Sequence, residues 1–260
     1  MSLSLSLTTL LIVCPLVFCG GFVDAIAGGG GLISISAYIF AELPMHMVLG
    51  TNKLSSCIGL GTSTLRFALS GYTNLKASII SAICAIIGSI LGSNLALITP
   101  GKTFQVIMLT LMPFIAFFIF RKNSPLQSKE LQSKVTTFSK TTIVRIVIST
   151  FLIGIYDGFY GPATGTFLIV ILTSFAKLGL NEAIGLGKIA NFSSAFISFI
   201  VFAISGNVWW QLGLICCIFS IVGNFVGAGL VMKDGSKVVR PIIAIVLVLL
   251  FIKVLSELLI

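Results

Sequence analysis

Charged residues are scarce in this 260-residue chain, and their scarcity excludes most soluble folds. Only 9% of the residues are Asp, Glu, Lys or Arg, and one residue is His, whereas about 25% of an average soluble domain is charged. Apolar residues make up 57% even before the 26 glycines are counted. A soluble chain of this size buries only about 70–75% of its surface, so it cannot hide this much apolar side chain.

Catalytic and metal-binding patterns are also missing. The six cysteines show no CxxC spacing and all fall within apolar segments, so we expect neither a disulfide nor a metal site. No nucleophile–base pair is recognisable, and the glycine run 28–31 lacks the Gly-Lys-Ser/Thr of a phosphate-binding loop. We therefore expect no enzyme and no cofactor. The net charge of +9 is not accompanied by interleaved aromatic residues, so we expect no nucleic-acid partner.

Long uncharged runs are what the chain does contain. Residues 1–23, 77–101 and 103–120 carry no charged side chain, and the pair Gly206-Asn207 divides a fourth run, 189–232. Each stretch approaches or exceeds the roughly 20 residues that a helix needs to cross a bilayer. Backbone groups in lipid must be satisfied within the segment, and barrel strands would alternate in polarity, which these do not. The sequence therefore predicts an all-α integral membrane protein.

An internal duplication organises the chain. Asp24 in GGFVDAIAGGGG recurs as Asp157 in IGIYDGFYGPATG, 133 positions later. After a two-residue insertion the offset becomes 135, and Lys53 then matches Lys188. The same offset aligns Gly71 with Gly206, Gly88 with Gly223, Gly92 with Gly227, and Lys102 with Lys237. We predict two transmembrane repeats, 1–121 and 141–260, joined by a basic cytoplasmic linker, 122–140.

Each repeat contains five apolar segments. In the first repeat they are 5–26, 31–41, 45–70, 74–99 and 102–120, and in the second 141–159, 163–177, 181–205, 208–232 and 238–258. The second segment of the first repeat is too short to cross a bilayer untilted. Glycines precede this segment, and Pro162 and Gly165 lie at the corresponding position of the second repeat. Short, Gly-interrupted helices at corresponding places in two halves indicate a transporter's binding site near the midplane.

Basic residues predict the orientation, because they are enriched in cytoplasmic loops. Six of the sixteen lie in the stretch 121–145, which is therefore placed inside. With an odd number of segments per repeat the two repeats are inverted, and the inside also receives Arg66, Lys76, Lys177, Lys233, Lys237 and Arg240. Four crossings per repeat would move several of these outside, so the inverted arrangement is favoured. The short segments can still either span or re-enter the bilayer.

Four charged residues lie deepest in the repeated motifs: Asp24, Lys53, Asp157 and Lys188. A charge at mid-bilayer costs about 2.5–3.5 kcal/mol on insertion scales, which makes each a functional candidate. We expect the lysines to bind an anion, and the aspartates to orient the lysines or to take part in coupled proton movement. The alternative is two structural ion pairs, or lysines that reach to a membrane interface.

The glycine turns provide a second reason to expect an anion. A helix that begins near Leu32 would direct its first N–H groups and its positive dipole end at the turn 28–31. Pro162 suits the first turn of the matching helix. Close packing of small residues is the alternative reading, and it is the one we apply to Gly71, Gly88, Gly92, Gly223 and Gly227. The predicted substrate-binding residues are Gly28, Gly29, Gly30, Gly31, Thr51, Asn52, Lys53, Gly161, Pro162, Ala163, Thr164, Lys188 and Asn191.

These motifs resemble those of the sulfite exporter TauE/SafE family, and its YfcA-like branch most of all. The resemblance rests on GGFVDAIAGGGGLISI, LGTNKLSS, GIYDGFYGPATGTF and GLGKIANFSS, and it covers nearly the whole chain. It implies a secondary transporter of a bacterial inner membrane for a small anion, sulfite or another organosulfur or organic anion. An anion-selective channel and a membrane-embedded structural or enzymatic subunit are the alternatives. The substrate, the direction of transport, the coupling ion and a homodimeric state are left open.

Overall fold

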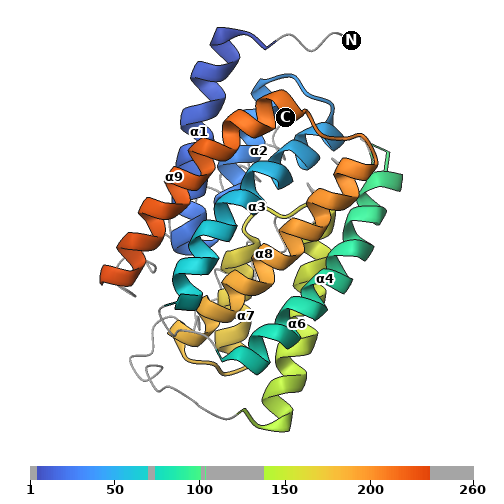
Figure 1. Ribbon diagram of the computed structural model, residues 1–260. Coiled ribbons are helices and arrows are strands. Elements are labelled where there is room, and N and C mark those ends of the chain that lie inside the picture. Colours follow the sequence, from blue (N-terminus) through green and yellow to red (C-terminus); the bar gives the residue numbers. More distant parts are fainter. Residues whose placement is uncertain (1–4, 70–73, 101–102, 104–137, 235–260) are drawn as a thin grey trace, which may run out of the picture.

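The computed structural model describes residues 5–69, 74–100, 103 and 138–234, and over these ranges it is helical throughout (Figure 1). The first repeat contains α1 (Leu7–Ala27), α2 (Gly31–Phe40), α3 (Met45–Leu69) and α4 (Leu75–Ile98), and the second contains α6 (Lys140–Phe159), α7 (Thr164–Ser174), α8 (Leu180–Ile204) and α9 (Trp210–Asp234). These eight helices match the first four predicted segments of each repeat. The predicted fifth segments and most of the linker 122–140 lie outside the described residues.

Polar residues at the helix starts explain several boundaries. The Ser6 side chain accepts a hydrogen bond from the third residue of α1, and Asn74 and Ser139 cap α4 and α6 in the same way. Each such cap satisfies one of the backbone N–H groups that a helix start leaves without a partner. The caps and the glycine and proline punctuation are local features, and for that reason the helices could be read from the sequence.

The bundle is apolar on its outside, and its interior combines an apolar core with buried polar groups. Large apolar side chains project outward, with Leu7 73%, Leu75 75% and Ile218 61% exposed, whereas Lys53 and Lys188 are only 3% and 2% exposed. Five of the described helices are long and apolar enough to cross a membrane: α1, α4, α6, α8 and α9. Lipid chains would meet the apolar faces, while polar groups find partners within the protein. The predicted all-α integral membrane class is confirmed.

The two repeats are interlocked through glycines. Helix α4 packs against α6, and α1 against α9. An added Cβ at Gly88 would lie 2.3 Å from the Phe151 carbonyl oxygen, and one at Gly223 would lie 2.3 Å from the Phe18 carbonyl oxygen. Equivalent glycines thus bring backbones into contact at equivalent interfaces, as membrane helices commonly do. The packing role predicted for these residues agrees with this geometry, whereas Gly71 lies outside the described residues.

Helices α3 and α8, which occupy equivalent places in the two repeats, run in opposite directions. Gly50, near the start of α3, lies against Phe202, near the end of α8. Thr64, towards the end of α3, donates a hydrogen bond to the carbonyl of Lys188, near the start of α8. The inverted relation of the complete repeats stays a prediction, and these opposite directions support it.

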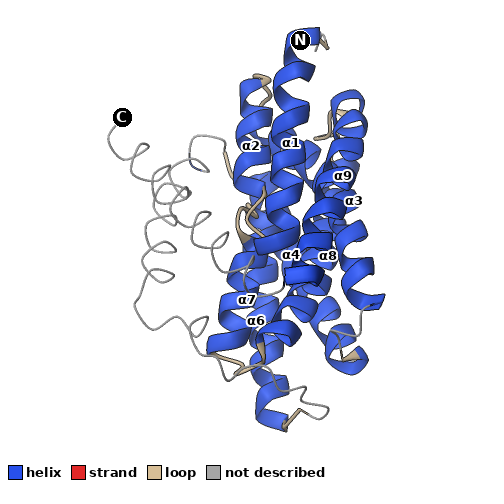
Figure 2. Ribbon diagram, turned by 90° about the vertical axis from the view of Figure 1, so that its left-hand side faces the viewer, coloured by secondary structure: helices blue, strands red, loops and turns tan. Residues whose placement is uncertain are grey.

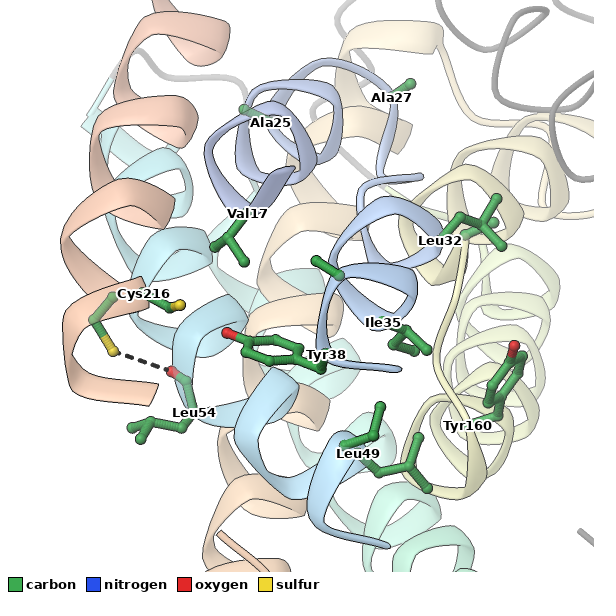
Figure 3. Close-up of a cluster of buried hydrophobic side chains, with 14 of the residues drawn as sticks. Val17, Ala25, Ala27, Leu32, Ile35, Tyr38, Leu49, Leu54, Tyr160 and Cys216 are labelled. Carbon is green, nitrogen blue, oxygen red and sulfur yellow. Dashed lines mark hydrogen bonds between the residues drawn. The ribbon is translucent and has the colours of Figure 1, made fainter. Parts of the chain in front are cut away.

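An apolar cluster anchors the short helix α2. Figure 3 shows Tyr38 and Ile35 of α2 among Val17 of α1, Leu49 of α3 and Cys216 of α9. The buried Tyr38 hydroxyl donates to Ser55 of α3 over 2.7 Å, so its polar end is satisfied. This packing fixes α2 within the bundle, and with α2 it fixes the glycine turn that precedes it.

Candidate functional site

The turns that precede the two short helices touch each other. The backbone N–H of Gly165 donates to the Gly28 carbonyl over 3.1 Å, and the Thr166 hydroxyl donates to the Ala27 carbonyl over 2.7 Å. In Figure 2, α2 lies above α7, and the loops that precede them meet partway along the bundle. The two predicted glycine turns, one from each repeat, are therefore brought together by the fold.

Two of the predicted ligand-binding glycines serve the packing of this junction. Gly28 has φ 76°, and a Cβ there would lie 2.2 Å from the Gly165 Cα. A Cβ at Gly30 would lie 1.9 Å from the Gly20 carbonyl oxygen of α1. Neither position admits a side chain in this arrangement, whatever binds nearby. Gly31 is less crowded, since its Cβ would lie 3.3 Å from the nearest atom, the Cα of Pro162.

Lys53 of α3 crosses to the second repeat. Its Nζ lies 2.9 Å from the Oδ1 of Asp157 and donates to the Asp157 backbone carbonyl over 2.6 Å. Gly161 leaves room for this contact: its φ is 97°, and a Cβ there would lie 2.6 Å from the Lys53 Nζ. The glycine at this turn is therefore required both by its backbone conformation and by the lysine beside it.

Asp157 has partners on both of its carboxylate oxygens. The Thr164 hydroxyl, at the start of α7, lies 2.7 Å from Oδ1, and the Ser194 hydroxyl of α8 donates to Oδ2 over 2.7 Å. Ser89 of α4 donates in turn to the Ser194 carbonyl over 2.7 Å. With Lys53, these contacts make Asp157 a fully bonded carboxylate that links both repeats at the N-terminus of α7.

Asp24 holds the equivalent place in the first repeat, but its carboxylate is bonded differently. Lys188 of α8 donates to the backbone carbonyl of Asp24, as Lys53 does to that of Asp157. The Asp24 side chain lies against Gly30 at the start of α2, where an added Cβ on Gly30 would be 2.6 Å from the Asp24 Cβ. Among the described residues, the ion pair within 4 Å is that of Lys53 and Asp157. The lysines are thus arranged alike, whereas only one aspartate is locked in an ion pair.

The predicted donors of the segment 51–53 face different neighbours, because successive helix residues are rotated by about 100°. Thr51 accepts the backbone N–H of Trp209 over 2.9 Å, which serves the start of α9. Asn52 accepts the Ser34 hydroxyl of α2 over 2.6 Å. Of these three residues, Lys53 contacts the second-repeat turn.

The remaining predicted residues lie on or beside the second turn. Helix α7 begins at Thr164, so Pro162 precedes its first turn, and the Pro162 carbonyl accepts the Tyr156 hydroxyl over 2.7 Å. Ala163 is the helix N-cap with φ 60°. The Asn191 amide nitrogen would lie 3.3 Å from a Cβ at Gly165. Asn191 and Lys188 of α8 therefore face this junction from its second-repeat side.

A small cavity of about 10 Å³ lies beside Asp24, enough for about one water-sized group. Its polar lining comes from Asp24, Ser34, Ser55, Ser56, Ser220 and Asn224. Sequence reasoning did not assign Ser34, Ser55, Ser220 or Asn224 to a site. A signal was present for one of them: Asn224 follows the packing glycine Gly223 and matches Ser89 at the repeat offset.

The groups in this region are suited to binding a polar ligand. It offers two lysine ammonium groups, hydroxyls and the N-termini of two helices. Within the described part of the chain, no group of three or more His, Cys, Asp or Glu residues is placed to hold a metal ion.

Comparisons with known proteins agree with this architecture. Residues 13–254 match the model of the family described as "Sulfite exporter TauE/SafE". A "Probable membrane transporter protein ORF9" of Sinorhizobium is 37% identical over 92% of this chain and 90% of its own. A "Probable membrane transporter protein" of Haemophilus influenzae is 33% identical over 88% of this chain and 89% of its own. "Probable membrane transporter protein YfcA" of Escherichia coli is 28% identical over 91% of this chain and 86% of its own.

No solved structure matches the chain. The family model nevertheless covers both repeats from residue 13 of α1 to residue 254, including the two glycine turns and the buried lysines. The protein is therefore a cell-membrane transporter that belongs to the sulfite exporter TauE/SafE family.

Proposed function

We propose that this protein is a secondary transporter for a small anion, sulfite or an organosulfur or organic anion, which binds where the two glycine turns meet. The observation that carries this proposal is the pair of buried lysines. Lys53 and Lys188 occupy equivalent repeat positions, and each reaches into the opposite repeat. Burying an ammonium group within a membrane protein is costly, and two such groups at a junction of broken helices are typical of a substrate pathway.

The same contacts suggest how transport works. Both lysine contacts join the repeats, so a rocking of one repeat against the other must break or remake them. An anion that binds an ammonium group competes with the carbonyl and carboxylate oxygens that this group now contacts. Binding is thereby coupled to the relative position of the repeats, which we take as the two moving bodies, 1–121 and 141–260. The gradient of an ion or the membrane potential would supply the energy.

Uptake of radiolabelled anions into proteoliposomes tests this function. We expect saturable uptake of sulfite or of a small sulfonate, and acceleration by unlabelled anion on the opposite side. Lys53→Ala and Lys188→Ala should each lower uptake about tenfold or more, the scale of losing one charged contact. Lys140→Ala is the matched control, because Lys140 lies exposed at the start of α6. Uptake at the parent rate in both variants would make the lysines structural, and conductance without exchange would indicate a channel.

A further inference from the structure

The two short helices each hold a protein carboxylate at their N-terminus. The Asp24 side chain lies against Gly30 before α2, and Asp157 contacts the Thr164 hydroxyl at the start of α7. A helix N-terminus attracts anions through its dipole and its unpaired N–H groups. Both positions suited to a substrate anion are therefore already occupied by the protein's own negative charges.

The first of these carboxylates borders a small cavity. Asp157 is held by Lys53, Thr164 and Ser194. Asp24, in contrast, lines the cavity at the start of α2 together with Ser220 of α9. Ser220 is 2% exposed, and its hydroxyl makes no hydrogen bond within the described ranges. The Ser220 hydroxyl is therefore available to donate a hydrogen bond to a group that enters this cavity.

Three of the hydroxyl positions are apolar at the matching place in the second repeat. At the repeat offsets, Ser220 corresponds to Ala85, Ser55 to Ala190 and Ser34 to Phe167. The other polar lining positions stay polar, since Ser56 corresponds to Asn191 and Asn224 to Ser89. The two halves of the junction therefore differ in these three hydroxyls, which lie on the side of Asp24.

The charges around Asp24 decide what the cavity admits. Lys188 of α8 donates to the Asp24 backbone carbonyl. Lys53 of α3 and Asp157 form an ion pair at the second-repeat turn, so their charges largely cancel each other. Helices α2 and α9 present hydroxyl and amide groups at the cavity. A substrate anion beside an ionised Asp24 would meet a like charge at short range. A proton on Asp24 removes that charge.

We propose that the α2 end of the junction is the anion-coordinating subsite, in which Asp24 is a resident carboxylate that a substrate oxygen replaces only when Asp24 takes up one proton. This inference rests on the function proposed above and adds the coupling ion to it. The proton comes from the aqueous phase on the side where the anion enters and leaves with the anion on the other side. Ser220 and Asn224 contact the bound anion, and transport is symport of one proton with each anion.

Proton movement in the unaltered protein provides the first test. Methanesulfonate is the probe, because it stays ionised over the whole pH range used. Proteoliposomes that contain a pH-sensitive dye should acidify inside as methanesulfonate enters, with one proton per anion. An inward proton gradient should accumulate the anion. If the protein takes up no anion at all, the proposed function fails; if it takes up methanesulfonate without acidification, only the coupling inference fails.

Asp24→Asn separates coupling from binding. The neutral amide imitates protonated Asp24, so we expect anion exchange to persist at every pH while gradient-driven accumulation is lost. A variant that is folded by size-exclusion chromatography but accumulates the anion normally would overturn the inference, and so would one that no longer exchanges it. Ser220→Ala should weaken methanesulfonate binding about tenfold, whereas Ser198→Ala, a buried serine of α8 outside the cavity, should not. Equal binding in these two serine variants would remove the cavity from the site.

Discussion

At the scale of single residues, Gly161 shows how one backbone position creates the cross-repeat contact. Its φ is positive, and an added Cβ would lie 2.6 Å from the Lys53 Nζ, so no side chain fits beside the lysine. Gly206 has a similar backbone conformation, with φ 72°, but no atom within 4 Å of an added Cβ. A comparison of substitutions at Gly161 and Gly206 therefore separates the cost of backbone strain from the cost of displacing Lys53.

We predict that Gly161→Ala loses more stability and more transport than Gly206→Ala. In both variants an alanine must adopt a left-handed backbone conformation, which costs about 1–2 kcal/mol. Only Gly161→Ala must also displace Lys53 from Asp157. Melting in detergent and proteoliposome uptake measure the two effects. If the two variants melt and transport alike, the ion pair contributes nothing beyond the backbone cost.

At the scale of helices, close backbone approach holds the repeats together and also fixes the first glycine turn. A Cβ at Gly92 would lie 2.0 Å from the Ile155 carbonyl oxygen across the α4–α6 interface. Between α1 and the turn before α2, a Cβ at Gly30 would likewise lie 1.9 Å from the Gly20 carbonyl oxygen. In contrast, a Cβ at Gly187 of α8 would meet its nearest neighbour, the Leu168 Cβ, at an ordinary 3.4 Å.

We predict that Gly92→Ala and Gly30→Ala both melt early, with or without an added anion. Each variant forces a backbone shift of the kind that costs about 1–3 kcal/mol in an overpacked core. Gly187→Ala should melt at or above the parent temperature, because alanine favours a helix and the space is sufficient. A parent-like melting temperature for Gly92→Ala would show that the α4–α6 interface adjusts without cost.

At the scale of the whole molecule, basic residues at the ends of the described helices gather at one end of the bundle, whereas Lys53 and Lys188 are buried. In Figure 1, α3 ends and α4, α6 and α8 begin in the lower part of the bundle, and the red end of α9 lies at the left. Arg66 of α3 donates to the Phe225 carbonyl of α9, so these two helix ends are neighbours. Arg66 lies in the last turn of α3 and Lys233 in that of α9. Lys76 and Lys140 lie in the first turns of α4 and α6. This common end is the one that the positive-inside rule assigns to the cytoplasm.

We therefore predict that this end and the linker 122–140 are cytoplasmic, and that both termini are extracytoplasmic. Reporter fusions after Leu69 and after Ile260, with labelling of single cysteines at the same positions, measure the topology. The fusion after Leu69 should report the cytoplasm and the fusion after Ile260 the opposite side. A cytoplasmic Ile260 would contradict five segments in each repeat, while leaving the arrangement of the described helices unchanged.

The sequence by itself determined the membrane class, the described helices and the family. Apolar runs, caps and glycine punctuation act over a few residues, so they specify each helix without knowledge of its neighbours. The duplication also paired Asp24 with Asp157 and Lys53 with Lys188 as equivalent residues. Equivalence, however, does not say which of them touch.

The tertiary structure decided the contacts within the junction. Lys53 meets Asp157 and Lys188 meets Asp24 across sequence separations of 104 and 164 residues, because each repeat places its turn against the other. It placed Gly28 and Gly30 in close backbone contact with their neighbours, directed Thr51 to the start of α9, and brought Ser220 beside Asp24. Such contacts depend on how distant helices cross and rotate, which no local pattern of residues encodes.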